Sequence, residues 1–226
     1  MNGYAFTLAG AELVALPSGA LFWPAQGLLA VSDLHLGRAE RMARRGGALL
    51  PPYETTDTLL RLEAEIAVTA PRQVVCLGDS FDDDAAAAAL PEEVRMWLAR
   101  LMAGRGWVWV TGNHDPAPPV AAGTPRAALA LGPLTFRHIP EAAACGEVAG
   151  HYHPKLRLGL GGARASRPCF LIDAARVVMP AFGTYTGGLS TDAAALASLM
   201  GAGALAVMTG PQARPVPMPR RRAAAP

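Results

Sequence analysis

The sequence predicts an α/β fold in which two stacked mixed β-sheets are flanked by helices, a four-layer sandwich. Apolar strand-like runs alternate with helical segments early in the chain, and further strand-like runs follow later. Several of these runs end abruptly in Asp, Asn or His. Because α/β sheets bind ligands beyond the carboxyl ends of their strands, we expect a metal site at that edge.

Four short apolar runs, typical of strands buried on both faces, are expected at residues 28–32, 73–77, 107–111 and 147–149. Each leads into polar residues that could bind a cation: Asp33-Leu34-His35, Gly78-Asp79, Gly112-Asn113-His114-Asp115 and Gly150-His151-Tyr152-His153. Further strands are expected at residues 134–137, 169–173, 176–180 and 205–209.

Helices are expected between these strands. One lies between Tyr53 and Pro71, where apolar residues recur with helical spacing, and a second begins at Pro91 and ends near Gly104. A weaker helix is expected at residues 192–200. From about Pro211, proline, alanine and arginine replace the periodic pattern. We therefore expect one domain at residues 1–210 and a disordered tail at residues 211–226.

The composition limits the class of protein. A chain of 226 residues that is 51% hydrophobic can bury a sizeable core and is not intrinsically disordered. It has neither an apolar stretch of the roughly 18 residues that span a membrane nor the basic start of a secretory signal, so we expect a soluble cytoplasmic protein with no membrane contact. Subtracting Arg220–Arg222 from the net charge of +2 leaves −1, so bulk charge does not indicate nucleic-acid binding.

The histidines point to a metal site. The chain has five, and four of them fall in the polar segments that follow strands. In an extended backbone, the residues of an Asp-x-His or His-x-His triplet would place both side chains on one side. Asp79 could bridge two cations, and Asn113 offers a neutral carbonyl oxygen. The alternative is that these residues are satisfied core histidines and capping aspartates.

These motifs, in this order, resemble those of the calcineurin-like metallophosphoesterase superfamily. The resemblance is carried by Asp33-x-His35, Gly78-Asp79-x-x-Asp82, Gly112-Asn113-His114-Asp115 and Gly150-His151-x-His153. Segments 32–37, 49–55, 77–81, 150–154 and 180–189 are further similar to the bacterial ligase-associated DNA damage response endonuclease family, PdeM. Asp82 departs from that family, which carries His at this position.

The resemblance implies a binuclear site for two divalent cations. One cation would bind Asp33, His35, Asp79 and His153. The other would share Asp79 and add Asn113, His151 and His138, although His138 could instead be a surface imidazole. The bacterial relatives suggest Mn²⁺, with Fe and Zn²⁺ as alternatives for such mixed ligands. Two such cations lower the pKa of a shared water for attack on phosphorus.

The same resemblance implies that His114 is the general acid and that Asp115 orients it, the alternative being a structural imidazole. Candidate substrate contacts are Arg38, Arg41, Asp82 and Tyr185. The arginines that follow the first motif could instead form a solvated helix face, and Tyr185 could serve packing. Lys155 and Arg157, just after His153, are similar candidates for binding phosphate.

These motifs leave three alternative functions open. The first is a phosphodiesterase or endonuclease that acts on DNA in repair, with a DNA ligase and a helicase as partners and with homodimers as a further expectation. The second is a phosphatase or phosphodiesterase that acts on nucleotides or other small phosphate esters. The third is a non-catalytic scaffold with the same fold.

Overall fold

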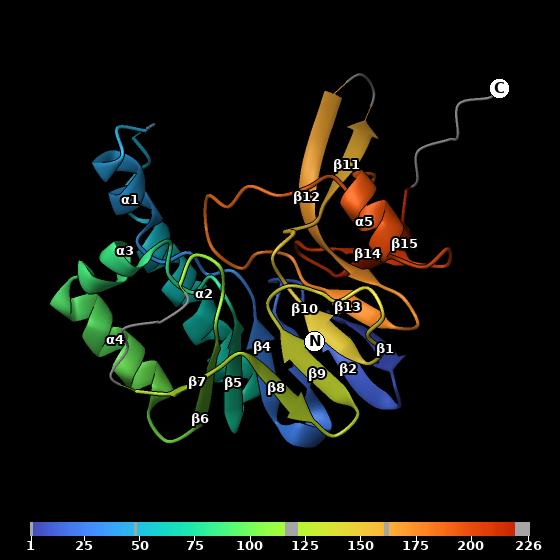
Figure 1. Cartoon of the computed structure of the whole chain (residues 1–226), viewed down its shortest axis with the longest axis horizontal. Coiled ribbons are helices and arrows are strands. Elements are labelled where there is room, and N and C mark those ends of the chain that lie inside the picture. The colour runs from blue at the N-terminus through green and yellow to red at the C-terminus, as the bar shows by residue number, and fades with distance from the viewer. Residues whose placement is uncertain (1, 48, 116–121, 161–162, 220–226) are drawn as a thin grey trace.

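The computed structural model describes residues 2–47, 49–115, 122–160 and 163–219. Two β-sheets pack face to face, and helices cover the outer face of each (Figure 1). This arrangement confirms the predicted fold class. Within the described residues, no helix combines the length and the apolar character needed to cross a membrane.

The first sheet has seven strands, in the order β1-β2-β3-β4-β5-β6-β7. Strands β4 to β7 are parallel, whereas β1 to β4 pair in antiparallel fashion. Their bounds are β1 (Tyr4–Leu8), β2 (Ala11–Ala15), β3 (Leu21–Trp23), β4 (Leu28–Val31), β5 (Gln73–Leu77), β6 (Gly106–Val110) and β7 (Thr124–Arg126).

The second sheet has the order β15-β14-β12-β13-β10-β9-β8, and β11 pairs with β12 off this path. Strands β9, β10 and β13 are parallel to one another. The bounds are β8 (Ala128–Leu131), β9 (Leu134–Arg137), β10 (Glu147–Ala149), β11 (Lys155–Leu160), β12 (Ala163–Ile172), β13 (Arg176–Val178), β14 (Leu205–Met208) and β15 (Arg214–Pro217).

The helices bury apolar stripes against the sheets. In α2 (Glu54–Thr69), Leu59, Leu62 and Ile66 recur at helical spacing and pack with α4 (Glu92–Met102) on the outer face of the first sheet. The short helix α5 (Ala194–Leu199) covers the second sheet through Leu196. Two further short helices follow site loops of the first sheet, namely α1 (Arg38–Arg44) and α3 (Asp84–Ala88), and a 3₁₀ turn spans Pro24–Gln26.

The structure changes several sequence-based boundaries. The four strands that precede the polar motifs, and the two longer helices, form where they were predicted. The helix expected at residues 192–200 is limited to Ala194–Leu199, and the strand expected at residues 169–173 is the end of the much longer β12. Strands β1 to β3 were not anticipated. They are only three to five residues long, so each offers few positions in which a periodic pattern can be recognised.

The expected disordered tail is wrong for residues 214–217, which form β15 and pair with β14. Ala213 and Met218 on either side are buried, and the Ala213 amide donates to the Asn2 carbonyl over 3.0 Å. Proline has no amide hydrogen to donate, but β15 is an edge strand, where proline is tolerated. Composition therefore suggested disorder for a segment that is ordered by one neighbouring strand. The last part of the expected tail, residues 220–226, lies outside the described residues.

Candidate metal centre

The polar motifs meet at the seam between the two sheets. Asp33 and His35 follow β4, Asp79 follows β5, and Asn113 and His114 follow β6, all in the first sheet. The second sheet contributes the remaining histidines from the ends of β9 and β10. Parallel strands bring their carboxyl ends to one edge, so residues far apart in sequence become neighbours. The second-sheet ligands are His138, His151 and His153.

The backbone at these positions is left-handed. The φ angles are 54° at Asp33, 46° at His35, 45° at Asp79, 69° at His151 and 46° at His153. The expectation that Asp-x-His and His-x-His lie on an extended backbone is therefore wrong. Such φ values are uncommon outside glycine and cost free energy, and they concentrate at functional sites.

Hydrogen bonds between loops hold this conformation. The Asp33 amide donates to the Gly78 carbonyl (3.2 Å), and the His35 amide donates to the Asp79 carbonyl (2.9 Å). Close approach also requires glycine at position 78, because a Cβ atom there would lie 2.4 Å from the His138 ring. At position 150, it would lie 1.9 Å from the Ser32 hydroxyl. The glycines of the motifs thus allow the ligand loops to pack against one another.

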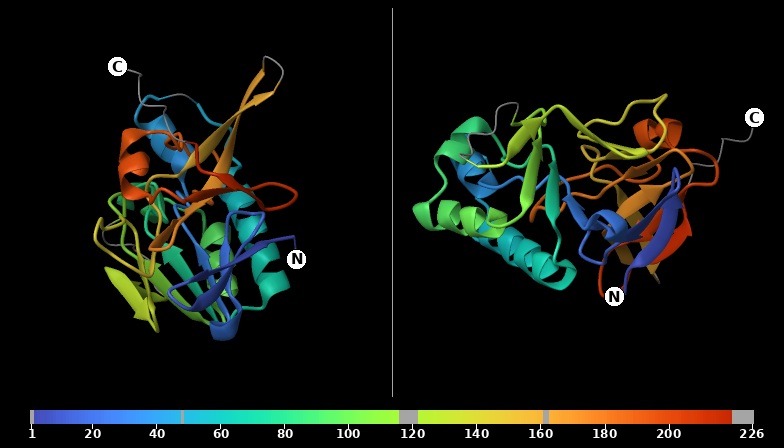
Figure 2. Two further views of the ribbon diagram at one scale, coloured as in Figure 1. Left: turned by 90° about the vertical axis from the view of Figure 1, so that its right-hand side faces the viewer. Right: turned by 90° about the horizontal axis from the view of Figure 1, so that it is seen from below.

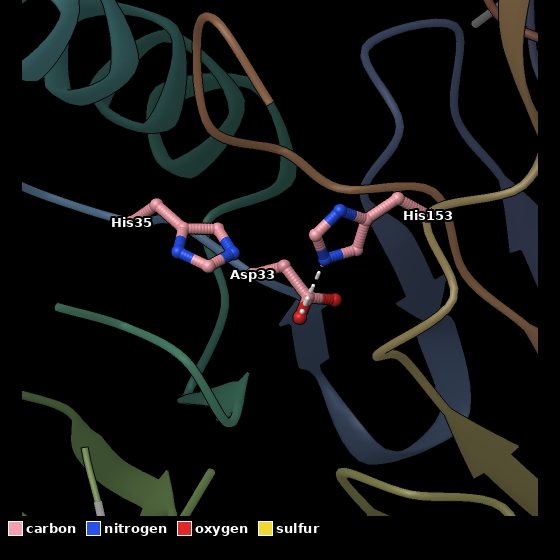
Figure 3. Close-up of side chains that lie close together, drawn as sticks. All are labelled: Asp33, His35 and His153. Carbon is pink, nitrogen blue, oxygen red and sulfur yellow. Dashed lines mark ion pairs between the residues drawn. The ribbon is translucent and has the colours of Figure 1, made fainter. Parts of the chain in front are cut away.

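The first ligand group consists of Asp33, His35 and His153 (Figure 3). Asp33 Oδ1 lies 3.0 Å from His153 Nε2, and the rings of His35 and His153 are 5.3 Å apart and nearly perpendicular. Asp33 Oδ1, His35 Nε2 and His153 Nε2 are buried, and apart from the ion pair between Asp33 and His153 none has a hydrogen-bond partner within the described part of the chain. Carboxylate oxygen and imidazole nitrogen are ligands for a divalent transition metal, so these three atoms fit a cation.

The second group gathers around His138 Nε2. This atom lies 3.3 Å from Asp79 Oδ2, 3.0 Å from Asn113 Oδ1 and 3.2 Å from His151 Nδ1. On the other side of the ring, His138 Nδ1 lies 3.0 Å from the Leu77 carbonyl. Donation from Nδ1–H to that carbonyl leaves Nε2 as the atom that can bind a cation. His138 thus lies beside the residues with which it was expected to share a cation, and with 3% of its surface exposed it is not a surface imidazole.

Asp79 links the two groups. Its Oδ2 atom lies 4.0 Å from His35 Nε2 and 3.3 Å from His138 Nε2. Burial raises the pKa of Asp79, but the hydrogen bond and charge of His138, with a smaller effect of His35, lower it to about 2. Burial lowers the pKa of His138, but Asp79 and Asp33 raise it to about 9. The centre therefore favours positive charge at the point where a metal would bind.

Asp82 lies behind His35 and not in the open site. Its side chain is fully buried, and Oδ1 lies 2.8 Å from His35 Nδ1. Arg38 contacts Oδ1 over 3.0 Å, and Arg41 contacts Oδ2 over 2.9 Å. Burial raises the pKa of Asp82, but His35 and the two arginines hold it well below its usual range. Asp82, expected as a substrate contact together with Arg38 and Arg41, is thus buried in an ion-pair cluster with these two arginines next to His35.

His114 is oriented differently from the expectation. Its Nδ1 atom lies 2.9 Å from the carbonyl oxygen of Asp82, and its amide donates to Asp79 Oδ1 over 2.9 Å. Asp115, expected to orient the imidazole, is 1% exposed and accepts hydrogen bonds from the amides of Ser80, Phe81 and Gly112. Asp115 therefore ties the loop after β6 to the loop after β5 and acts on His114 through the backbone.

Burial and the charge of Asp79 raise the pKa of Asp115 to about 6, against the lowering effect of the three amides. A carboxylate that is fully occupied by backbone donors holds the loop in place without reaching a substrate. The Ser32 hydroxyl has a similar supporting role, because it donates to Asp33 Oδ2. Ser32 directly precedes the Asp-x-His motif, and this position is the one sequence signal that could have indicated its supporting role.

A connection that we call the strap, residues 182–189, crosses the edge of the centre (the orange segment between β13 and α5 in Figure 1). The amides of Phe182 and Gly183 donate to the carbonyls of Ser32 and Asp33, and the Leu189 amide donates to the Tyr152 carbonyl. The strap therefore touches ligand loops from both sheets.

Polar contacts with α2 hold the strap from outside. Arg61 donates to the Phe182 carbonyl over 2.6 Å and to the Thr184 hydroxyl over 2.9 Å. Tyr185 has a φ of 62°, is 37% exposed and lies next to Tyr53, with ring centroids 6.2 Å apart. The sequence did not indicate Tyr53 as a neighbour of the site.

Comparison with known proteins agrees with this geometry. The family model for the calcineurin-like phosphoesterase matches residues 28–160. Among solved structures, the nuclease MPE of Pseudomonas putida matches with a TM-score of 0.74 and 29% sequence identity, over 95% of this chain and 100% of that one. No curated protein sequence gives a significant match. The family match spans all five loops that carry the candidate metal-binding residues, so the chain belongs to the calcineurin-like phosphoesterases, hydrolases that act on phosphoester bonds with divalent metals.

Proposed function

We propose that the protein is a binuclear metal-dependent phosphodiesterase that cleaves DNA. The observation that carries the proposal is the position of Asp79 between two groups of buried imidazole and carboxylate ligands. The similarity over almost the whole chain to a protein described as a nuclease supports a nucleic acid over a small ester as the substrate.

One cation would be held by Asp33, His35, Asp79 and His153. The second would share Asp79 and add Asn113, His138 and His151. The donor set is mixed nitrogen and oxygen, which suits Mn²⁺, with Fe and Zn²⁺ as the competing choices. When bound, two such cations supply a nucleophile at neutral pH and neutralise charge on the phosphate oxygens.

The protein itself supplies the proton for the leaving group. His114 is held at Nδ1 by the Asp82 carbonyl, which leaves Nε2 free to protonate the departing oxygen. Because Asp115 fixes the backbone of the loop, the imidazole needs little reorganisation when substrate binds.

Tyr185 supports a nucleic-acid substrate. It is a partly exposed aromatic residue with a left-handed backbone, on a strap that is bonded to a ligand loop. Together with Tyr53, which is 57% exposed, it offers a surface on which a base beside the cleaved bond can stack.

The test combines metal analysis with a substrate panel on the purified protein. We expect cleavage of single-stranded or duplex DNA with Mn²⁺, loss of cleavage in EDTA and its recovery when Mn²⁺ is restored. Asp79→Asn should lose bound metal and activity, whereas the exposed Asp84→Asn should keep both. Hydrolysis of nucleotides or aryl phosphodiesters with no cleavage of DNA would instead favour the small-ester function. Activity of the protein in excess chelator would contradict the metal mechanism.

A place in DNA repair, with a DNA ligase and a helicase as partners and with homodimers in the cytoplasm, is part of the same proposal. It rests on the resemblance of the motifs to the ligase-associated endonucleases. Co-purification of tagged protein with such partners, and survival of a deletion strain after DNA damage, would test it.

A further inference from the structure

The β11–β12 hairpin extends outward from the metal centre. Strand β11 begins at Lys155, two residues after the ligand His153. In Figure 1 and in the left view of Figure 2, the hairpin projects beyond the body of the two sheets. Only the base of β12, Cys169–Ile172, pairs with the second sheet, and the outer part pairs with β11 alone. The hairpin is therefore an arm whose outer part extends beyond the second sheet.

The arm is basic throughout. Residues 154–172 contain four basic residues and no Asp or Glu. Arg157 and Arg167 are exposed, and in the described part of the chain neither forms an ion pair with a carboxylate. By contrast, the arginines of α1 that follow the first motif are paired with acidic side chains of the next loop. Unneutralised positive charge near the centre thus lies on the arm.

The two faces of the arm differ. Residues directly opposite in the ladder share a face, and alternate residues of a strand share it too. Lys155 and Arg157 therefore lie on one face. Leu156 lies on the other, where it packs with Leu196 of α5, and Arg167 stands opposite Leu156 in the ladder.

Lys155 shows which face is turned toward the centre. Its Nζ atom donates to the Thr186 carbonyl of the strap over 2.8 Å. The strap in turn bonds to the loop of the ligand Asp33. The face of Lys155 and Arg157 therefore continues from the metal centre, and the leucine face is covered by α5.

We propose that the Lys155–Arg157 face of the arm binds the sugar-phosphate backbone of a DNA strand whose cleaved phosphodiester lies at the metal centre. This inference rests on the proposed function and specifies how a polymer is held. Arginine binds phosphate through a planar fork of donors. Arg157 lies about 7 Å beyond Lys155 along the strand, so it serves the flanking part of a long substrate.

The test measures binding without cleavage. Full-length protein is titrated into a fluorescein-labelled single-stranded DNA oligonucleotide in EDTA, and anisotropy is followed at several salt concentrations. Arg157→Gln should weaken binding about tenfold and reduce the slope of log K against log salt by about 0.7. Arg167→Gln is the matched control, because it removes the same charge from an exposed residue of the same hairpin on the opposite face. It should change the affinity less than twofold.

Unchanged binding by Arg157→Gln, or equal weakening by both variants, would overturn the assignment of this face. Cleavage assays with Mn²⁺ separate the two proposals. If the wild type cleaves DNA and Arg157→Gln has the same KM for it, the proposed role of the arm in DNA binding is wrong and the nuclease function is retained. If the wild type binds DNA through Arg157 without cleaving it, the nuclease function is wrong and the role of the arm in binding is retained.

Discussion

His35 Nδ1 lies 2.8 Å from Oδ1 of the fully buried Asp82, so the ligand ring is held from behind by a carboxylate. Two arginines of α1 neutralise the same carboxylate. A carboxylate that binds the second nitrogen of a metal-ligating histidine fixes its tautomer and raises its basicity. Asp82 is therefore a positioning residue of the centre, and α1 contributes through it.

Replacing Asp82 should weaken metal binding without removing a ligand. We expect Asp82→Asn to reduce metal affinity about 10- to 100-fold, because the amide no longer balances the charge of Arg38 and Arg41 or orients His35. Titration of the metal-free protein with Mn²⁺ measures the change. Asp84→Asn, at an exposed position nearby, is the control. Equal affinity of Asp82→Asn and wild type would contradict the role of Asp82.

His114→Ala should separate metal binding from turnover. Loss of the general acid should lower kcat by about 10²- to 10⁴-fold for substrates with poor leaving groups, while the metal content stays the same. The defect should shrink for aryl esters, whose leaving groups need no proton. Rates for a series of phosphodiesters of increasing leaving-group pKa, plotted for both proteins, make the comparison. A constant defect across the series would exclude proton donation by His114.

Metal binding should release a proton. In the metal-free protein, the pKa of His138 is raised to about 9, so this ring is charged at pH 7 and must lose its proton to bind a cation. Affinity should therefore rise with pH up to about 9. The same raised pKa stabilises the metal-free fold below the unfolded pKa of about 6.5, and this contribution is lost as the pH rises through 9. Calorimetric titrations in buffers of different ionisation enthalpy count the protons released; a count of zero at pH 7 would oppose this account.

Truncation should distinguish β15 from the residues that follow it. Deletion after Pro219 is expected to leave the melting temperature unchanged. Deletion after Gly210 removes β15 and the buried Met218, and should cost at least about 2 kcal/mol of unfolding free energy. Thermal unfolding of the two truncated proteins gives the comparison. Equal stability would mean that β15 adds nothing to the fold.

Much of the centre was predictable because its ligands lie in short motifs directly after apolar strands. Asp33, Asp79 and His151 became candidates on that basis, and the resemblance to the metallophosphoesterases gave their roles. Parallel pairing of β4, β5 and β6 agrees with their buried character. His138 was the least marked, since its strand ends without a glycine motif. The structure places it against Asp79 and Asn113.

The remaining features depend on contacts between distant segments. The left-handed φ values of the ligands arise from hydrogen bonds between loops, which no local pattern encodes. Nor does the sequence show that Asp82 forms ion pairs with Arg38 and Arg41, because Asp82 lies about 40 positions after these arginines in the chain. Lys155 and Arg157 were candidates for binding phosphate from their place after His153, but the sequence did not show the hairpin that gives them a common face, because that face forms only when β11 pairs with β12.

The division of the ligands between the two sheets has a consequence for stability. Asp33, His35, Asp79 and Asn113 come from one sheet, and His138, His151 and His153 from the other. Bound cations would link the two sheets through these residues, adding RT ln(1 + [M]/Kd) to the free energy of unfolding. Removing the cations with a chelator should then weaken the contact between the sheets before either sheet unfolds, and the amide hydrogens of the ligand loops should exchange with solvent first.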